Sequence, residues 1–308
     1  MTSNEHTKFI PVRKSQLKFY KKFSLYYQTS TNNYVLYKPD GELLTDSRIE
    51  QGRLPPLYVH QNDRIKVIKE LQKAFNKDLK RKIVAGNISD VKKTLCSLVE
   101  ETLSEPRSGT FEAVTETMDI LISGYANNSD VLKKLAYISN KDYSTAIHSV
   151  NVMALTLGFC FHNDVPHENT KAYGLSALLH DVGKTEIPSA ILKAPRKLTF
   201  QEYKIMKSHT TIGKEIICND KSIDYSISLG ALEHHEKLDG SGYPEGKKQI
   251  TFIGQLLGIV DCYEALTNED RRYRRAKSPI NTLKIIKEDV EQGKYNKEIF
   301  KQFCYSIV

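Results

Sequence analysis

The segment Ala177-Leu-Leu-His-Asp-Val-Gly-Lys184 places a His-Asp pair directly after an apolar stretch with helical spacing. An imidazole and a carboxylate at the end of a buried helix need partners, because an unpaired polar group in an apolar core costs several kcal/mol. Similar side chains recur beside other apolar helical stretches. The full set is His148, His180, Asp181, His209, His234, His235 and Asp261. The pattern predicts polar side chains that converge inside a helical bundle.

Metal coordination explains this set better than separate core histidines do. A single histidine of this kind is more often a hydrogen-bonded core residue, but here His-Asp, His, His-His and Asp follow one another at intervals of 28, 25 and 26 residues. Five imidazoles and two carboxylates suffice for two divalent ions if one carboxylate bridges them. Nitrogen and oxygen donors without thiolate suit iron, manganese, zinc or nickel, and do not suit copper or an iron–sulfur cluster.

The spacing of apolar residues predicts the fold class. After residue 82, apolar residues recur at helical intervals, as in the segments 88–99, 111–122 and 147–155. Before residue 63, short aromatic and β-branched runs separated by turn residues predict three to five strands. We therefore predict a mainly α protein. Its parts are a small basic α/β N-terminal module over residues 1–63, a helical connector over 64–85 and an all-α helical bundle over 86–308.

The formal net charge of +8 falls almost entirely within residues 1–82, and the rest of the chain is close to neutral. A solvated basic face on a regulatory or partner-binding module is the interpretation we favour. Attraction to anionic lipid or to an acidic protein is a weaker alternative. Single-stranded nucleic acid is the weakest, although lysines and tyrosines are interleaved there.

Cysteine use and hydropathy favour a cytoplasmic location. The five cysteines are widely spaced and include no C-x-x-C pair, which argues against a disulfide framework or a structural zinc finger. The N-terminus lacks the apolar segment of a signal peptide. The most apolar windows, 154–161 and 252–260, are shorter than the roughly 20 residues that a membrane span needs. We expect no stable membrane span.

The sequence resembles the HD-GYP family of the HD-domain metal-dependent phosphohydrolases. The most specific likeness is His234-His-Glu-Lys-Leu-Asp-Gly-Ser-Gly-Tyr-Pro244. The segment 177–184, the segments 187–192 and 198–202, and His209 with Gly213 extend it. The resemblance runs from about residue 140 to about residue 279, and nothing before residue 82 takes part in it.

This resemblance implies hydrolysis of cyclic di-GMP to pGpG or GMP with two divalent metal ions. Iron and manganese are the preferred candidates for these ions, followed by zinc and nickel. The first ion would be held by His148, His180, Asp181 and Asp261, and the second by Asp181 as a bridge with His209, His234 and His235. Lys184, with Asp181, would act beside a bridging water or a phosphate oxygen. Substrate contacts would come from Asp239, Gly240, Gly242, Tyr243, Pro244, Arg271, Arg272 and Arg274. A protein partner could use the N-terminal module or the Gly-Tyr-Pro loop.

Three places depart from the family pattern. Ser144 stands where some members have a glutamate for a third metal, which favours a dinuclear site. Gly254-Gln-Leu256 replaces Ala-Arg-Ile, and the segment 268–274 is one residue longer than usual and lacks a proline. Two alternatives therefore stay open: a catalytically degenerate cyclic di-GMP sensor or partner-binding protein, and an HD phosphohydrolase that acts on another nucleotide.

Overall fold

A computed structural model describes residues 9–20, 22–31, 33–42, 44, 54–125, 129–138, 144–268 and 276–307. The chain divides into two compact units, Met1–Phe75 and Asn76–Val308. The division falls within the long helix α2 (Arg64–Val84), in the segment for which the sequence predicts a helical connector. The three-part division over 1–63, 64–85 and 86–308 stays a prediction.

The first unit contains a four-stranded antiparallel sheet with the order β1-β4-β2-β3. Tyr26 pairs with Leu36 on one side and with Tyr58 on the other. Phe9 stacks on Tyr34, with ring centroids 4.2 Å apart. These strands confirm the small sheet predicted from the aromatic and β-branched runs. The strands are β1 (Phe9–Pro11), β2 (Leu25–Gln28), β3 (Tyr34–Lys38) and β4 (Leu57–His60), and the 3-10 helices are η1 (Lys14–Phe19) and η2 (Gln61–Asp63).

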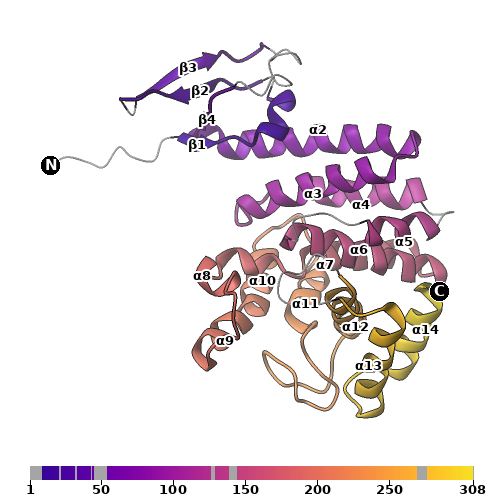
Figure 1. Cartoon of the computed structure of the whole chain (residues 1–308). Coiled ribbons are helices and arrows are strands. Elements are labelled where there is room, and N and C mark those ends of the chain that lie inside the picture. The colour runs from indigo at the N-terminus through magenta and orange to yellow at the C-terminus, as the bar shows by residue number, and fades with distance from the viewer. Residues whose placement is uncertain are drawn as a thin grey trace. The chain divides into compact units, whose positions relative to one another are not determined.

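The described residues of the second unit form helices joined by loops, which confirms the mainly α fold. Figure 1 shows these helices in chain order from magenta to yellow. They are α3 (Ile88–Ser104), α4 (Glu112–Tyr125), α5 (Ser129–Tyr137), α6 (Thr145–His162), α7 (His167–Leu179), η3 (Val182–Glu186), α8 (Ser189–Leu192), α9 (Phe200–Lys207), α10 (His209–Cys218), α11 (Tyr225–Glu233), α12 (Phe252–Thr267), α13 (Pro279–Glu291) and α14 (Lys297–Ile307).

Helix α6 lies at the centre of this unit. Residues 146–160 are all buried, because α6 packs against α3, α5, α7, α12 and α14. A helix that is apolar on every face belongs in a core. Within the described part of the chain, α6 alone is long and apolar enough to cross a membrane by length and composition, and its burial in the bundle accounts for that composition.

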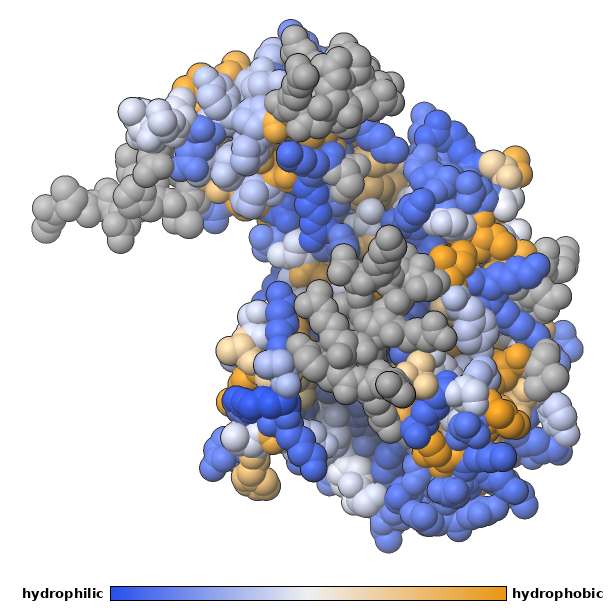
Figure 2. Space-filling model, viewed as in Figure 1, coloured by the Kyte–Doolittle hydropathy of each residue, from blue (hydrophilic) through white to orange (hydrophobic). Residues whose placement is uncertain are grey.

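The visible surface of the helical unit is mostly hydrophilic. In Figure 2 blue residues dominate this face, and orange residues lie in small separate groups. Phe200, at the start of α9, is the most exposed aromatic residue among the described ones, with a relative exposure of 80%. Most of the other large apolar side chains are buried in the core.

Local capping signals fix the helix ends that position the candidate site. The Ser144 hydroxyl caps α6 and accepts a hydrogen bond from the Ile147 amide at 3.3 Å. Thr199 and Glu202 form both arms of a capping box at the start of α9. Helices α7 and α11 end just before His180 and His234, which take the C-cap positions and turn their side chains into the bundle.

Candidate metal centre

The structure brings all seven predicted ligands together. His148 lies in the first turn of α6 and Asp261 lies in α12. The other five come from the ends of α7 and α11 and the start of α10, namely His180, Asp181, His209, His234 and His235. Five of the seven are almost completely buried; His235 and Asp261 are partly exposed. Segments far apart in the sequence thus form one polar cluster inside an apolar bundle.

The carboxylate of Asp181 faces two groups of imidazoles. Its Oδ2 lies 3.5 Å from Nε2 of His148 and 3.4 Å from Nε2 of His180. Its Oδ1 lies 3.4 Å from Nε2 of His209 and 3.9 Å from Nε2 of His234. The two oxygens are therefore divided between the two groups, as expected for a carboxylate that bridges two cations.

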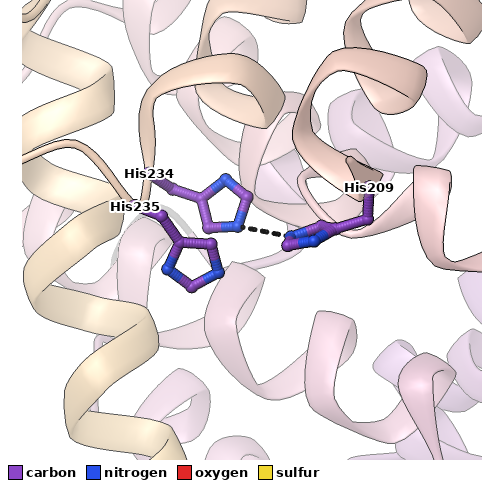
Figure 3. Close-up of side chains that lie close together, drawn as sticks. All are labelled: His209, His234 and His235. Atoms are coloured by element: carbon purple, nitrogen blue, oxygen red, sulfur yellow. Dashed lines mark hydrogen bonds between the residues drawn. The ribbon is translucent and has the colours of Figure 1, made fainter. Parts of the chain in front are cut away.

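Each group is compact enough for one ion. The ligand atoms of His148, His180 and Asp181 all lie within 4.8 Å of one another, and Asp261 Oδ1 lies 2.9 Å from Nε2 of His148. The ligand atoms of His209, His234 and His235 also lie within 4.8 Å of one another. Figure 3 shows the His209 ring directed at the His234–His235 pair from a separate segment.

Hydrogen bonds to backbone carbonyls fix the tautomers of three ligands. Nδ1 of His180 donates to the Ala177 carbonyl at 2.7 Å, and Nδ1 of His209 donates to the Met206 carbonyl at 2.7 Å. Nδ1 of His234 lies 3.0 Å from the carbonyls of Gly230 and Ala231. Since a carbonyl only accepts, these Nδ1 atoms carry the protons, and the Nε2 lone pairs point into the site.

Burial keeps the second group neutral. It lowers the pKa of His209 to about 4 and that of His235 to about 3, and it lowers the pKa of His234 well below the usual range. His148 behaves differently: burial lowers its pKa, but Glu264 and Asp261 outweigh burial and raise it to about 9. At neutral pH, three imidazoles are unprotonated and available as ligands.

The two aspartates are ionised. Burial alone would raise the pKa of Asp181, but Lys184 and His180 outweigh burial and hold that pKa well below its usual range. Burial would likewise raise the pKa of Asp261, and His148 reverses the effect. Near neutral pH the cluster therefore offers two carboxylates and the neutral imidazoles of the second group, whereas His148 releases a proton when it binds an ion.

The donor set fits divalent metal ions. Oδ1 of Asp181 is buried, and it has no hydrogen-bond partner within the described part of the chain. Nε2 of His209 lies 3.3 Å from Nε2 of His234, and Nε2 of His180 lies 3.2 Å from Nε2 of His148. The buried, ionised oxygen of Asp181 and the facing lone pairs of His209 and His234 are unfavourable without a cation, and divalent ions would satisfy both.

Gly183 permits the tight turn that carries the His-Asp pair. A Cβ atom at this position would lie 2.0 Å from the His209 carbonyl oxygen and 2.6 Å from the Gly213 amide nitrogen. Helix η3 can therefore pack directly on the start of α10. Lys184, the next residue, reaches back so that its Nζ lies 2.5 Å from Asp181 Oδ2.

The Gly-Tyr-Pro loop, residues 236–251 between α11 and α12, is the long orange loop in Figure 1. Gly240 has a φ of +85°, which favours glycine. A Cβ atom on Gly242 would lie 2.4 Å from the Lys237 amide nitrogen. These glycines let the loop fold back on itself beside the histidine pair.

The remaining loop residues predicted to contact substrate differ in their surroundings. Tyr243 stacks on His235, with ring centroids 4.6 Å apart and an interplanar angle of 29°, and a cis peptide joins it to Pro244. Asp239 is exposed, and its carboxylate accepts hydrogen bonds from the amide and hydroxyl of Ser241. Tyr243 thus borders the metal cluster, whereas Asp239 shapes the turn. Arg271, Arg272 and Arg274 lie outside the described residues.

Two buried glutamates that flank the histidine pair anchor this loop, and the sequence did not single them out. Glu233 accepts hydrogen bonds from Lys247 Nζ at 2.5 Å and from the Thr251 amide at 2.8 Å. Glu236 accepts from the backbone amides of Glu245 and Gly246 at 2.7 and 3.2 Å. The sequence gives only a weak indication of these two glutamates, because their partners are loop residues and backbone amides, which follow no periodic pattern.

Glu264 is a third buried glutamate that was missed. Its Oε2 lies 2.6 Å from Nδ1 of His148, and its Oε1 accepts hydrogen bonds from the side-chain amides of Asn151 and Asn268. A spacing of three residues places it on the same face of α12 as Asp261, which is a signal that the sequence did contain.

Two departures from the family pattern have a local physical reason. A methyl group at position 254 would lie 2.6 Å from Cβ and 2.7 Å from Oε2 of Glu233, so Gly254 provides space for that glutamate. The Gln255 side chain donates to the Ile250 carbonyl at 2.8 Å. Ser144 serves as a helix cap. The segment 269–275 lies outside the described residues.

Comparison with known proteins agrees with this geometry. The profile of the HD domain family matches residues 128–299, more than half of the chain. The chain therefore belongs to the HD domain family. Enzymes of this kind are metal-dependent phosphohydrolases, and the histidine and aspartate groups described above could hold the metal.

Curated relatives are phosphodiesterases of cyclic dinucleotides. A cyclic di-GMP phosphodiesterase of Pseudomonas aeruginosa is 27% identical over 195 residues, which cover 63% of this chain and 46% of that protein. One of Thermotoga maritima is 38% identical over 133 residues, 42% of this chain and 35% of that protein. A 3'3'-cGAMP-specific phosphodiesterase of Vibrio cholerae is 30% identical over 174 residues, 53% of this chain and 38% of that protein. The chain spans less than half the length of these relatives.

A solved structure shares the fold over almost the whole chain. The HDG"Y"P protein from Bdellovibrio bacteriovorus matches with a TM-score of 0.64 and 18% identity, covering 96% of this chain and 98% of that chain. This likeness concerns the fold alone, since the identity is low.

Proposed function

We propose that this chain is a metal-dependent phosphodiesterase that hydrolyses cyclic di-GMP to pGpG or GMP. The observation that carries the proposal is the carboxylate of Asp181, whose two oxygens face two separate groups of imidazoles. The names of the curated relatives support the substrate class.

The metal ligands form two half-sites, one for each ion, which correspond to the two ligand groups on either side of Asp181. Two divalent ions, when bound, supply a water acidic enough to yield hydroxide near neutral pH, together with positive charge for the phosphoryl oxygens. The half-site with His148, His180 and Asp261 carries an additional carboxylate, whereas the half-site with His209, His234 and His235 offers only neutral imidazoles. Asp181 serves both.

Lys184 supplies a fixed positive charge beside the reacting groups. Its Nζ lies 2.5 Å from Asp181 Oδ2, and 22% of its side chain is exposed. The ammonium group can therefore keep its hydrogen bond to Asp181 and still donate to a phosphoryl oxygen. In a site from which water is partly excluded, such a charge stabilises a developing negative charge more than it would in water.

The Gly-Tyr-Pro loop provides the surface for the nucleotide. The Tyr243 ring stacks on His235, a member of the second half-site, and the side chain is only partly buried. A base that reaches the site can contact this ring while its phosphate lies near Lys184. Gly240, Gly242 and Pro244 shape the path of the loop, and Arg271, Arg272 and Arg274 are the proposed basic contacts for the phosphates.

We further propose two ions per chain, iron or manganese, with zinc or nickel as the next candidates. The set of nitrogen and oxygen ligands supports these elements. Ser144, where a ligand for a third ion would stand, is used as the cap of α6, and this supports a dinuclear site.

A second candidate substrate is 3'3'-cGAMP. The observation in its favour is the Vibrio cholerae relative, whose name assigns it that specificity. Both cyclic dinucleotides present the same phosphodiester to the metal centre, so the choice between them falls to residues that contact the bases.

One experiment separates these activities from a sensor without catalysis. Metal-free protein is loaded with Fe²⁺ or Mn²⁺ under exclusion of oxygen and incubated with cyclic di-GMP or 3'3'-cGAMP, and products are followed by chromatography. We expect pGpG or GMP from cyclic di-GMP, and loss of product in Asp181→Asn. Asp220→Asn, a change at a buried carboxylate whose hydrogen bonds go to Phe111 and Ser222, is the matched control. Binding of cyclic di-GMP without product would establish the sensor instead.

The protein partner and the cytoplasmic location stay predictions. The five cysteines are free thiols, which accords with a reducing compartment. The N-terminal sheet and the Gly-Tyr-Pro loop remain the two surfaces proposed for a partner.

A further inference from the structure

The described imidazole ligands are not held alike. Nδ1 of His180, His209 and His234 contacts backbone carbonyls, which are neutral acceptors. Nδ1 of His148 instead lies 2.6 Å from a carboxylate oxygen of Glu264. One ligand of the first half-site thus depends on a charged side chain that itself lies outside the two ligand groups.

Glu264 is held firmly in this position. Its relative exposure is 3%, and its Oε1 accepts hydrogen bonds from the side-chain amides of Asn151 at 2.8 Å and Asn268 at 2.6 Å. Asn151 lies on α6, one turn after His148, so the same two helices carry the ligand and its support. The carboxylate has little freedom to turn away from the imidazole.

A carboxylate at Nδ1 has three effects on a ligating histidine. It keeps the proton on Nδ1, so Nε2 presents its lone pair to the metal; it fixes the plane of the ring; and it raises the basicity of the ligand. At His148, Nε2 lies 2.9 Å from Asp261 Oδ1 and 3.5 Å from Asp181 Oδ2, so a fixed ring keeps the three donor atoms convergent.

We propose that Glu264 is a positioning residue for metal binding, which acts through His148 and serves the first half-site but not the second. This inference rests on the metal binding in the proposed function, but on no particular substrate. Loss of the Glu264 carboxylate should therefore weaken metal affinity at only one of the two classes of metal site. General destabilisation of the protein would not produce this pattern.

The test measures metal affinity without any nucleotide. Metal-free wild-type protein, Glu264→Gln and the control Asp220→Asn are titrated with Mn²⁺ against a fluorescent chelator, and circular dichroism checks the fold. We expect a 10- to 100-fold weaker affinity at one class of site in Glu264→Gln, with the other class and the control unchanged. Unchanged affinity at both classes, or an equal loss at both, would overturn the proposal.

A cavity next to Glu264 allows a second, independent readout. It has a volume of about 510 Å³, and its lining includes Asn151, Glu264 and Asn268. In Glu264→Ala, formate supplied through this cavity can take the place of the missing carboxylate. We expect millimolar formate to restore part of the lost Mn²⁺ affinity in this variant and to leave wild type and Asp220→Asn unaffected. A defect in Glu264→Ala that formate does not relieve would show that the side chain acts by packing, against the proposal.

Discussion

Glu233 fills the space that a side chain at position 254 would need. A methyl group there would lie 2.6 Å from its Cβ atom, and Glu233 in turn holds Lys247 and Thr251 of the Gly-Tyr-Pro loop. Glycine at 254, where the family usually has alanine, is therefore matched to the glutamate that precedes the histidine pair.

Gly254→Ala should destabilise the protein by about 1–3 kcal/mol, because the added methyl group overpacks a buried region. Thermal unfolding measures this change. Gly158→Ala is the matched control, since a Cβ atom there meets nothing within 4 Å and alanine favours a helix. If the two variants unfold at the same temperature, Gly254 has no packing role.

Lys184→Met should lower kcat by about 10²- to 10³-fold, because it removes a positive charge beside the reacting phosphoryl group. Metal content measured by mass spectrometry should stay as in wild type, since Lys184 is not a ligand. Lys184→Arg should recover part of the rate. Full activity in Lys184→Met would contradict a catalytic role for this ammonium group.

Tyr243→Ala should raise KM for cyclic di-GMP by about 10-fold, because a base that stacks on an aromatic ring gains about 1–3 kcal/mol. Tyr243→Phe keeps the ring and should have a smaller effect. Steady-state kinetics at fixed metal loading gives the comparison. Equal KM values in wild type and Tyr243→Ala would show that the loop does not contact the substrate.

The metal-free protein should lose stability as the pH falls from 6.5 to 4. The pKa of His209 is lowered to about 4 in the folded state, so between these values the unfolded chain binds more protons, and acid favours unfolding. The contribution of His209 is on the order of 3 kcal/mol. In His209→Asn, the melting temperature should depend less on pH across this range than it does in wild type. Identical pH profiles would contradict the assignment of a neutral, buried His209.

Much of the site could be predicted from the sequence because its residue types are rare in apolar helices. His148, His180 and Asp261 stand out beside apolar runs, and the structure brings them within a few ångströms of one another. The helical spacing likewise predicted the bundle, since one buried face per helix leaves a strong periodic signal.

Other features could not be predicted, for physical reasons. Glu233 and Glu236 bind backbone amides of a loop, and such contacts depend on how the loop closes rather than on a periodic pattern. The apolar window 154–161 covers only part of α6, because His148 and Asn151 interrupt the apolar run, although both side chains are buried in the helix. In a sequence, a polar residue within a buried helix looks like the end of that helix, because the buried partner that satisfies it is not visible.

In the proposed function Asp181 joins the two metal half-sites, and the metal content of the purified protein tests this role most directly. Wild-type protein reconstituted with Fe²⁺ or Mn²⁺ without oxygen should contain two ions per chain by inductively coupled plasma mass spectrometry. Asp181→Asn should retain less than one, and Asp220→Asn should retain two. Two ions in Asp181→Asn, or less than one in wild type, would contradict the account.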